Sequence, residues 1–241
     1  MRRGPLPELS DRRTGFLLPD VRELPLRWVA QGKSWVVISK PSGLLSVPGS
    51  SPDANDSAAE RVRARYPEAT GGLVVHRLDL PTSGLMVFAL TSEALSHLGD
   101  QFARRTVKKM YCAVLESRPQ GGLSGEVMLP LRLDPFQRPL QIYDPLHGRR
   151  CHTRWEVIEP HPLGIRVKLW PITGRTHQLR VHAAHPLGLN APIVGDPHYS
   201  RDARADGGPP HDLRLHLHAQ TLSFNDPDTG ERVEVEDPAP F

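Results

Sequence analysis

The sequence predicts an α+β fold, built on a mixed, largely antiparallel sheet with flanking helices. Short runs rich in β-branched and aromatic residues recur along the chain and are bounded by turn residues, which is typical of strands. Stretches of helix-forming composition are interspersed between these runs. The chain contains neither an internal repeat nor a heptad pattern of apolar residues, so a repeat protein or a coiled coil is not expected.

The first half of the chain contributes both strands and helices. Strands are expected at residues 35–38, 73–75 and 85–90. A turn at 40–43, which contains proline and glycine, follows the first strand. Helices are expected at 57–66 and 92–102, and in the second helix Leu95, Leu98 and Phe102 lie on one face.

The second half continues the pattern. Strands are expected at residues 109–115, 153–158 and 165–169. Residues 176–186 predict a short helix with Thr176 as its N-cap and Pro186 at its end. Residues 213–219 alternate strictly, which predicts a strand with buried leucines and with Arg214, His216 and His218 on the opposite face.

The 241 residues, 38% of them hydrophobic, are enough for one sizeable core. We expect residues 1–24 to form a tail or lead-in and residues 25–241 to form one domain. The longest apolar run, residues 85–90, has the length of a strand, so no membrane span is expected. The basic N-terminus is followed by charged and proline-rich sequence and does not resemble a secretory signal, so we expect a cytoplasmic protein.

The charge distribution predicts a polyanionic partner. Residues 225–241 carry six acidic residues and one basic residue, Arg232, a net charge of −5. The whole chain carries +3, so residues 1–224 carry a net charge of +8. The basic residues gather in three clusters: Arg61, Arg63 and Arg65; Arg104, Arg105, Lys108 and Lys109; Arg149, Arg150 and Arg154. The two cysteines, Cys112 and Cys151, form no CxxC motif and are expected to be reduced and structural.

One aspartate lies in a connection between two expected strands, with basic and turn-forming neighbours. Asp79 lies between two apolar runs, is preceded by His76 and Arg77, and is followed by a segment rich in Pro, Thr, Ser and Gly. An aspartate in such a place is most often a turn former. A rigid connection between two strands is also a good platform for a reactive group.

The ordered motifs around this aspartate resemble those of the RluA-like family of RNA pseudouridine synthases. The match begins with His76-Arg77-Leu78-Asp79 and Pro81-Thr82-Ser83-Gly84. Residues 40–44, 108–113, 174–182 and 195–199 are similar to further motifs of the family, in the family's order. One such motif alone is weak evidence, whereas the ordered set is specific and extends over most of the chain. The resemblance implies the pseudouridine synthase fold, with a central RNA-binding cleft, and no cofactor.

The resemblance also implies roles for three residues far apart in the sequence. Asp79 matches the family's essential aspartate, which attacks or deprotonates the nucleoside while the bond between ribose C1′ and uracil N1 breaks. A carboxylate suits this role because it is ionised at neutral pH. Arg180 matches the basic residue that pairs with this aspartate, and Tyr111 matches the active-site aromatic that stacks on uracil or assists proton removal from C5. Only the fold can bring these three together.

Further residues are expected to bind RNA. Arg77 resembles the family's arginine that enters the RNA stack when the uridine is flipped out, and binding to phosphate alone is the alternative. His76 and Thr82 belong to the same motif. The late motif contributes the remaining candidates at the start of the expected short helix: Arg175, Thr176, His177 and Gln178.

The expected substrate is ribosomal RNA first and transfer RNA second. Neither DNA nor a membrane is an expected partner, and a monomer is the simplest state. Before residue 25 the chain has no room for the S4-type RNA-binding domain of some family members, so RNA selection falls to the catalytic domain, for example to a loop at residues 134–150.

There are two alternative functions. The first is a metal-dependent hydrolase that uses His177, His182 and His185, or His216 and His218, but neither HExxH nor a carboxylate-completed ligand set is present, so no metal is expected. The second is a noncatalytic RNA-binding or ribosome-assembly protein. Substitution of Asp79 by alanine distinguishes the synthase from the noncatalytic protein. The synthase would lose turnover and still bind RNA, whereas the binding of a noncatalytic protein would barely change.

Overall fold

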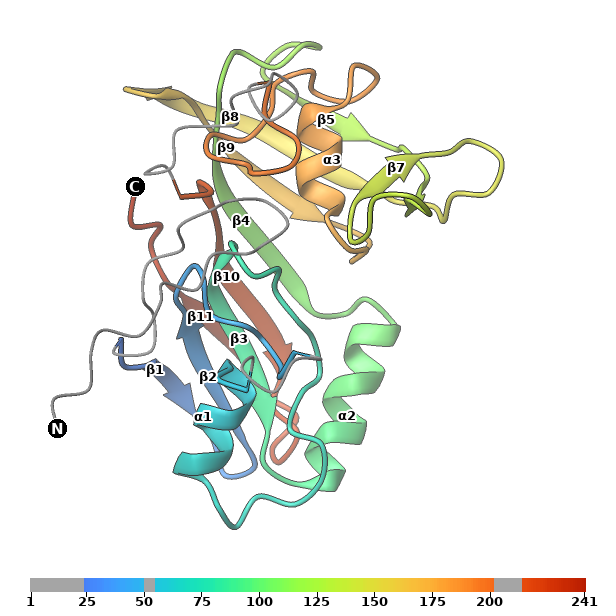
Figure 1. Cartoon of the computed structure of the whole chain (residues 1–241). Helices are drawn as coiled ribbons and strands as arrows, with labels where there is room; N and C mark the ends of the chain where they lie inside the picture. The colour runs from blue at the N-terminus through green and yellow to red at the C-terminus, as the bar shows by residue number, and fades with distance from the viewer. Residues whose placement is uncertain (1–23, 50–54, 202–213) are drawn as a thin grey trace, which may run out of the picture.

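The computed structural model describes residues 24–49, 55–201 and 214–241 (Figure 1). The expected tail at residues 1–24 therefore lies outside the described residues, apart from Leu24. The strands are β1 (Arg27–Gln31), β2 (Trp35–Lys40), β3 (Ser83–Ala89), β4 (Lys108–Leu115), β5 (Ser124–Val127), β6 (Leu131–Leu133), β7 (Gln141–Tyr143), β8 (Thr153–His161), β9 (Gly164–Pro171), β10 (Leu217–Asn225) and β11 (Arg232–Glu236). The helices are α1 (Ala58–Arg65), α2 (Ser92–Ala103) and α3 (Gln178–Ala184). No helix in these ranges is long and apolar enough to cross a membrane.

One nine-stranded sheet organises the chain. Its order is β1–β2–β3–β10–β4–β9–β8–β5, with β11 also paired to β10, while β6 and β7 form a separate hairpin. In the described ranges β10 and β3 are the parallel pair, and the other named strands pair antiparallel. The expected α+β class with a mixed, largely antiparallel sheet is confirmed.

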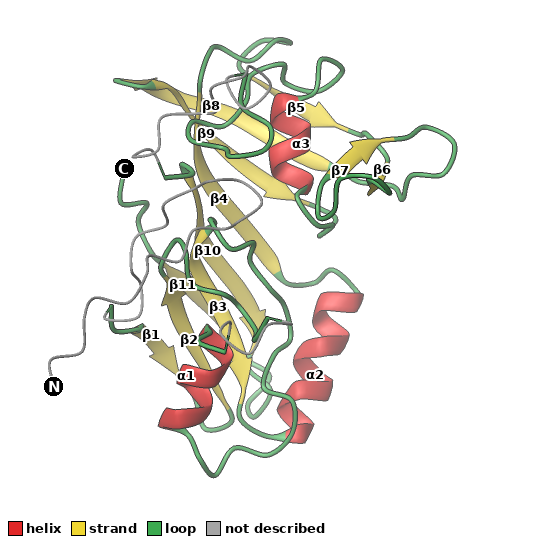
Figure 2. Ribbon diagram, in the orientation of Figure 1, coloured by secondary structure: helices red, strands yellow, loops and turns green. Residues whose placement is uncertain are grey.

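The sheet has two halves, which are joined through β4 and β10 (Figures 1 and 2). In one half α1 buries Val62 against strand residues such as Ile38, and α2 buries Leu98 against Val87 on the other face. In the other half α3 buries Val181 in a cluster with strand residues of β4, β9 and β8. Tyr111 packs against both the α1 cluster and the α3 cluster, so it lies where the two halves meet.

Both expected helices of the first half are confirmed, and local caps explain where they begin. The Ser57 side chain accepts a hydrogen bond from the Glu60 N–H (3.3 Å) at the start of α1. The Thr91 side chain accepts one from the Ala94 N–H (3.2 Å) at the start of α2. Each side chain satisfies a backbone donor that the first helical turn leaves unpaired.

Gly84 is required by the parallel strand pair beside the Asp79 loop. Its φ is +111°, and a Cβ at this position would lie 2.4 Å from the carbonyl oxygen of Ala219 on β10. A side chain would therefore both strain the backbone and collide with the neighbouring strand. The glycine of the Pro81–Gly84 segment thus allows β3 to approach β10 at the point where the Asp79 loop enters the sheet.

Three sequence expectations are corrected by the structure. Residues 73–75 form no strand, because Leu73 has a φ of +40° and Val74 makes a single bridge to Phe88. The N-cap of α3 is His177, in the left-handed region (φ +52°), and not Thr176. The expected loop at residues 134–150 contains β7, which pairs with β6.

The C-terminal segment departs furthest from expectation. The strand expected at 213–219 begins at Leu217 instead, while residue 213 lies outside the described residues. His216 and His218 are buried as well as the leucines, because the segment after β11 covers them: the Asp237 carbonyl lies 3.0 Å from His218 Nε2, and the Phe241 ring lies 4.7 Å from the His216 ring. The acidic segment includes β11 of the sheet: the buried Asp237 directly after it pairs with Arg27 through its carboxylate and with His218 Nε2 through its carbonyl. A structural role therefore accounts for some of these acidic residues.

His182 predicts a pH dependence of stability. It is buried in α3, its Nε2 lies 3.2 Å from the Leu129 carbonyl, and burial lowers its pKa to about 4. Between pH 6.5 and 4 the unfolded chain therefore binds a proton that the folded chain does not, so the free energy of unfolding falls as the pH falls. We expect His182→Gln, which keeps a donor for Leu129 but does not titrate, to remove up to about 1.4 kcal/mol per pH unit of this slope. Urea unfolding between pH 7 and 4 measures it.

The control for this measurement is His147→Gln. The His147 side chain is 77% exposed, so the slope should stay at the wild-type value. An unchanged slope in His182→Gln would contradict the assignment of this pH dependence to His182.

Candidate active site

Hydrogen bonds to its backbone fix the loop that carries Asp79. On one side, the Leu78 N–H donates to Ser46 Oγ (3.0 Å), and the Ser46 hydroxyl donates to the Leu78 carbonyl (2.6 Å). On the other side, the Thr82 N–H donates to the Asp79 carbonyl (3.1 Å). The carboxylate between these anchors is 25% exposed. The sequence thus builds a rigid loop with one accessible acid at its centre.

A buried lysine lies beneath this loop. Lys40 has no exposed surface, and its Nζ donates to the carbonyls of Pro41 (2.9 Å), Leu44 (2.7 Å) and Leu80 (3.1 Å). Burial lowers the pKa of Lys40 to about 7, and the negative charge of Asp79 opposes that shift. Lys40 therefore ties the end of β2 to the residue that follows Asp79.

Arg180 lies between two aspartates. Its Nε and Nη2 each lie 2.7 Å from a carboxylate oxygen of Asp196, in a bidentate pair, and its Nη1 lies 3.5 Å from Asp79 Oδ2. Arg180 is 1% exposed and Asp196 is fully buried. Burial would raise the pKa of Asp196, but Arg180 and the backbone N–H groups of His198 and Tyr199 hold it below its usual value. Asp196 thus fixes the guanidinium and leaves one nitrogen directed at Asp79.

His177 and Tyr199 form a second layer around Asp79. The Nδ1 of His177 lies 2.8 Å from the Tyr199 hydroxyl, and its Nε2 lies 3.9 Å from Asp79 Oδ2. Burial and the nearby Arg180 lower the pKa of His177 to about 4, so the ring is neutral at neutral pH. The left-handed backbone of His177 is strained for a residue with a side chain. This conformation turns the chain so that the ring faces the aspartate.

Tyr111 approaches the aspartate from β4, opposite Leu169 of β9 and Ala219 of β10. Burial and the negative charge of Asp79 raise the pKa of Tyr111 above its usual value. The phenol thus stays protonated at neutral pH, close enough to Asp79 for the charge of the carboxylate to affect it. The structure brings Asp79, Tyr111 and Arg180 together, although 32 and then 69 residues separate them along the chain.

The predicted RNA-binding residues of the Asp79 loop differ in their surroundings. The Arg77 side chain is exposed, and no ion pair to it is found among the described residues. The His76 ring stacks on Phe102 (4.7 Å between centroids), and its Nε2 accepts a hydrogen bond from the Val87 N–H (3.1 Å). Thr82 is buried, and its hydroxyl finds no partner within the described part of the chain. Arg77 alone is thus free to reach a ligand without rearrangement.

The late motif also divides into exposed and buried residues. Arg175 and Thr176 are exposed in the turn before α3. Gln178 is buried, where its Nε2 donates to the His152 carbonyl and Thr153 Oγ1, and its Oε1 accepts from Thr173 and from the Arg175 N–H. Gln178 therefore fixes the turn that presents Arg175.

The sequence alone gives no role to Asp196, Tyr199 or Lys40, although all three lie in the motifs at residues 40–44 and 195–199. One signal was available for Asp196: an arginine enclosed in a pocket needs a buried counter-charge, and the carboxylate of Asp79 must stay accessible to its substrate. No group of three or more potential metal ligands is present among the described residues. His182, His216 and His218 instead have partners within the fold.

Comparison with known proteins agrees with this geometry. Residues 34–185 match the family model described as RNA pseudouridylate synthase. The chain is similar to the dual-specificity RNA pseudouridine synthase RluA of Haemophilus influenzae, with 42% identity over 85% of this chain and 89% of the relative. The RluA of Escherichia coli K12 is 43% identical over 86% and 90% of the two chains.

Solved structures lead to the same fold. The human RNA Pseudouridylate Synthase Domain Containing 1 superposes with a TM-score of 0.70 and 28% identity, over 90% of this chain and 84% of that chain. The human RNA Pseudouridylate Synthase Domain Containing 4 gives a TM-score of 0.69 and 27% identity, over 89% and 88%. The chain therefore belongs to the RluA-like family of RNA pseudouridine synthases, isomerases that act on RNA.

Proposed function

We propose that Asp79 is the catalytic residue that starts the conversion of uridine to pseudouridine. Its carboxylate attacks or deprotonates the nucleoside as the bond between C1′ and N1 breaks. The uracil then rotates, C5 bonds to C1′, C5 loses its proton and N1 gains one. The product is an isomer of the substrate, so no oxidant, cofactor or energy source is needed. The observation that carries this proposal is the Arg180–Asp79 contact at 3.5 Å, with Arg180 itself held by buried Asp196.

Arg180 and Tyr111 would act beside the aspartate. A fixed guanidinium keeps the carboxylate ionised and aimed when RNA closes the site and excludes water. The Tyr111 ring offers a face on which uracil can stack, and its hydroxyl can assist proton transfer from C5. Asp196 would serve as a positioning residue, because it contacts Arg180 and not the reacting atoms.

The uridine must leave the RNA stack to reach Asp79. We propose that Arg77 enters the vacated space, because it is exposed two residues from the aspartate and its planar cation can stack on bases. The exposed Arg175 and Thr176 are proposed to contact the RNA backbone. Buried Gln178 and His177 would support them, and the proposed RNA contacts of His76 and Thr82 depend on rearrangement when RNA binds.

The substrates are proposed to be ribosomal RNA first and transfer RNA second. The bacterial relatives are named dual-specificity synthases, which supports two classes of RNA. We further propose that residues 25–241 form the catalytic domain, that the protein is a monomer that does not use DNA, and that it acts in the cytoplasm.

The test uses bulk RNA from a strain that lacks this gene. Wild-type and Asp79→Ala protein are incubated with separated ribosomal and transfer RNA, without cofactor or metal, and pseudouridine is mapped by carbodiimide primer extension. We expect new stops that depend on Asp79 in both pools. The absence of stops in both pools, together with tight RNA binding, would support a noncatalytic RNA-binding protein instead.

Tyr111→Phe tests the hydroxyl separately from the ring. The variant keeps the stacking face but loses the donor, so we expect kcat to fall roughly 10²-fold or more, as for loss of a group that assists proton transfer, with little change in RNA affinity. The isotope effect from uridine deuterated at C5 should also increase. An unchanged kcat would leave Tyr111 with a stacking role only.

A further inference from the structure

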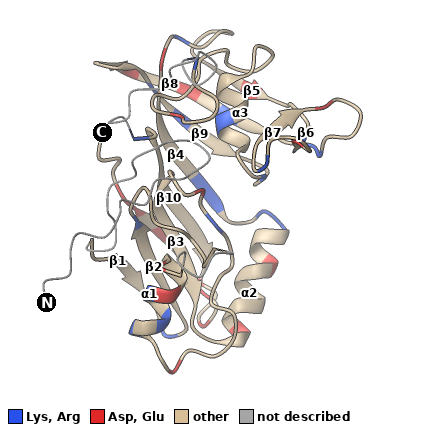
Figure 3. Cartoon of the chain, viewed as in Figure 1, with Lys and Arg blue, Asp and Glu red and all other residues tan. Residues whose placement is uncertain are grey.

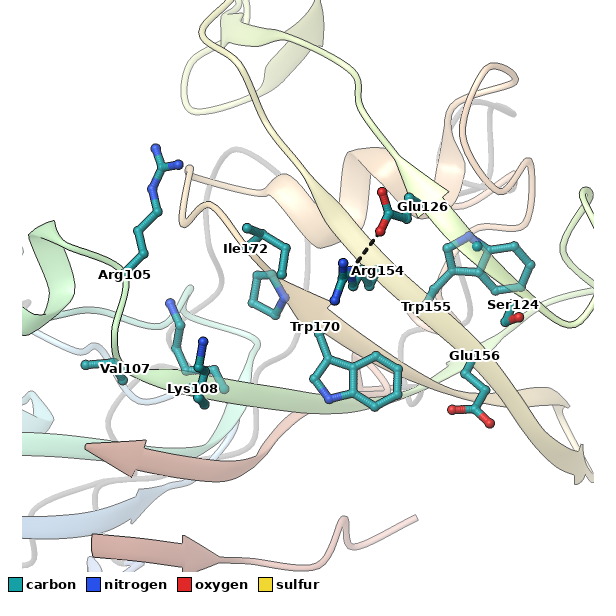
Figure 4. Close-up of a pocket in the computed structure, with 13 residues that line it drawn as sticks. Arg105, Val107, Lys108, Ser124, Glu126, Arg154, Trp155, Glu156, Trp170 and Ile172 are labelled. Carbon is teal, nitrogen blue, oxygen red and sulfur yellow. Dashed lines mark hydrogen bonds and ion pairs between the residues drawn. The ribbon is translucent and has the colours of Figure 1, made fainter. Parts of the chain in front are cut away.

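A groove lies on the face of the sheet that points away from α3 (Figure 4). Its volume is about 740 Å³, and its lining includes Arg105, Lys108, Lys109, Arg154, Glu156 and Trp170. Trp155 and Leu169 are buried in the α3 cluster. Because side chains alternate along a strand, Arg154 and Trp170 face the other way, into the groove, although Trp155 also lines it in part. No helix covers these residues in the described part of the chain.

The charge of the groove favours an anionic partner. Four cations and two acids line it, and Arg154 is paired with one of those acids, Glu126 (2.7 Å). Among the described residues, Arg105 and Lys108 form no ion pair, and both are exposed. Figure 3 shows Lys and Arg, in blue, where the chain passes from α2 to β4. The basic cluster at residues 104–109 therefore faces solvent at the entrance of the groove.

Trp170 gives the groove a surface that phosphate binding alone does not require. It is half-buried on β9, and Figure 4 shows its ring beside β4, on the same side of the sheet as Lys108. A fixed aromatic ring among cations is the arrangement that binds single-stranded nucleic acid, because bases stack on the ring while Lys and Arg follow the phosphates.

The groove continues toward the active site through one loop. Ile172, which lines the groove, lies three residues from the exposed Arg175. A Cβ at Gly174 in this loop would lie 3.5 Å from Lys109 Nζ, so Lys109 joins the loop to the groove. His177, two residues beyond Arg175, approaches Asp79. A strand whose uridine reaches Asp79 on the α3 face would pass this loop, with its basic residues Arg175 and Lys109, to reach the groove on the other face.

We propose that this groove is a second RNA-contact surface, which holds a single-stranded segment flanking the target uridine. Trp170 stacks on a base, and Arg105 and Lys108 contact phosphates. This inference rests on the proposed function, since it assumes that the uridine enters at Asp79. It assigns substrate selection to a surface outside the catalytic pocket.

The test measures equilibrium binding to two labelled RNAs by fluorescence anisotropy. One is a blunt hairpin with a uridine in its loop, and the other carries an oligoadenosine extension of roughly twelve nucleotides at its 5′ or 3′ end, within the length that such grooves bind. We expect the full-length protein to bind one extended hairpin about tenfold more tightly than the blunt one, and Trp170→Ala to remove most of this gain. Arg105→Glu and Lys108→Glu should each reduce the salt dependence of log K by about 0.7, as for one lost phosphate contact.

The matched control is Trp28→Ala. Trp28 is 39% exposed on β1, at the opposite end of the sheet from the groove, so this variant removes a comparable ring outside the groove. The control should retain the wild-type gain for the extended RNA. A 4-thiouridine placed in the extension should also crosslink to peptides that contain Trp170 or Lys108 in the wild-type protein.

The proposal would be overturned if the wild-type protein bound all these RNAs with equal affinity. It would also be overturned if Trp170→Ala lowered the affinity for blunt and extended RNA by the same factor. Pseudouridine formation in bulk RNA is measured in parallel. Its absence would contradict the roles given to Asp79, Tyr111 and Arg180, whereas its presence without a groove effect would contradict only the second surface.

Discussion

Asp79→Asn should reduce kcat for pseudouridine formation by at least about 10⁴-fold, the scale seen when a residue that forms part of a catalytic unit is lost. The amide has the shape of the carboxylate but can neither attack C1′ nor accept a proton at neutral pH. Release of tritium from RNA labelled at uridine C5 measures the rate. RNA affinity should stay the same or increase, because the substitution removes a negative charge near the phosphates.

The structure explains why this variant should remain folded. Arg180 keeps its bidentate pair with Asp196 when Asp79 loses its charge, and the Asp79 loop is held through Leu78 and Thr82. Asp100→Asn on α2 is the matched control, since this carboxylate is 53% exposed and its pair with Arg104 lies on the surface. Residual activity of Asp79→Asn within tenfold of wild type would show that another group performs the first step.

The sequence was most informative where a motif joins several elements. The motifs that contain Asp79, Tyr111 and Arg180 predicted that these residues meet. In the structure Arg180 Nη1 lies 3.5 Å from Asp79, and Tyr111 packs where the two halves of the sheet join, where the charge of Asp79 raises its pKa. The helices of the first half were also predictable, because Ser57 and the apolar spacing of α2 are local signals. Local signals of this kind depend on neighbours within a few residues.

The errors arose where distant segments decide the outcome. Residues 73–75 have a strand-like composition, but the left-handed Leu73 breaks the pattern. His216 and His218 were expected opposite the buried leucines, yet the chain end buries them too. Asp237 lies in a segment that is acidic in composition. Only its contacts with Arg27 and His218 in the structure show that it stabilises the fold. Propensity does not report such long-range pairings.

Asp196→Asn should lower both stability and activity. The Arg180 guanidinium is 1% exposed, and in this variant it loses its bidentate partner. Loss of one member of a buried ion pair lowers the free energy of unfolding by about 3–5 kcal/mol. The amide also turns a donor toward Arg180 Nε. We expect the melting temperature to fall by roughly 6–20 °C and kcat to fall about 10²-fold because Arg180 is misplaced. Calorimetry and tritium release measure the two effects, and Asp100→Asn should show neither.

A double variant separates the charge of Arg180 from the packing around it. Adding Arg180→Met to Asp196→Asn removes the unpaired cation, while the Asn oxygen can still accept the backbone N–H groups of His198 and Tyr199, as Asp196 Oδ1 does at 2.9 and 3.1 Å. A buried pair replaced by neutral side chains of similar volume is often as stable as the original. The double variant should therefore recover most of the lost stability and none of the lost activity. If it is no more stable than Asp196→Asn alone, the unpaired charge is not the cause. If it recovers turnover, Arg180 does not act on Asp79, and the aspartate must be aimed by the loop bonds of Leu78 and Thr82 alone.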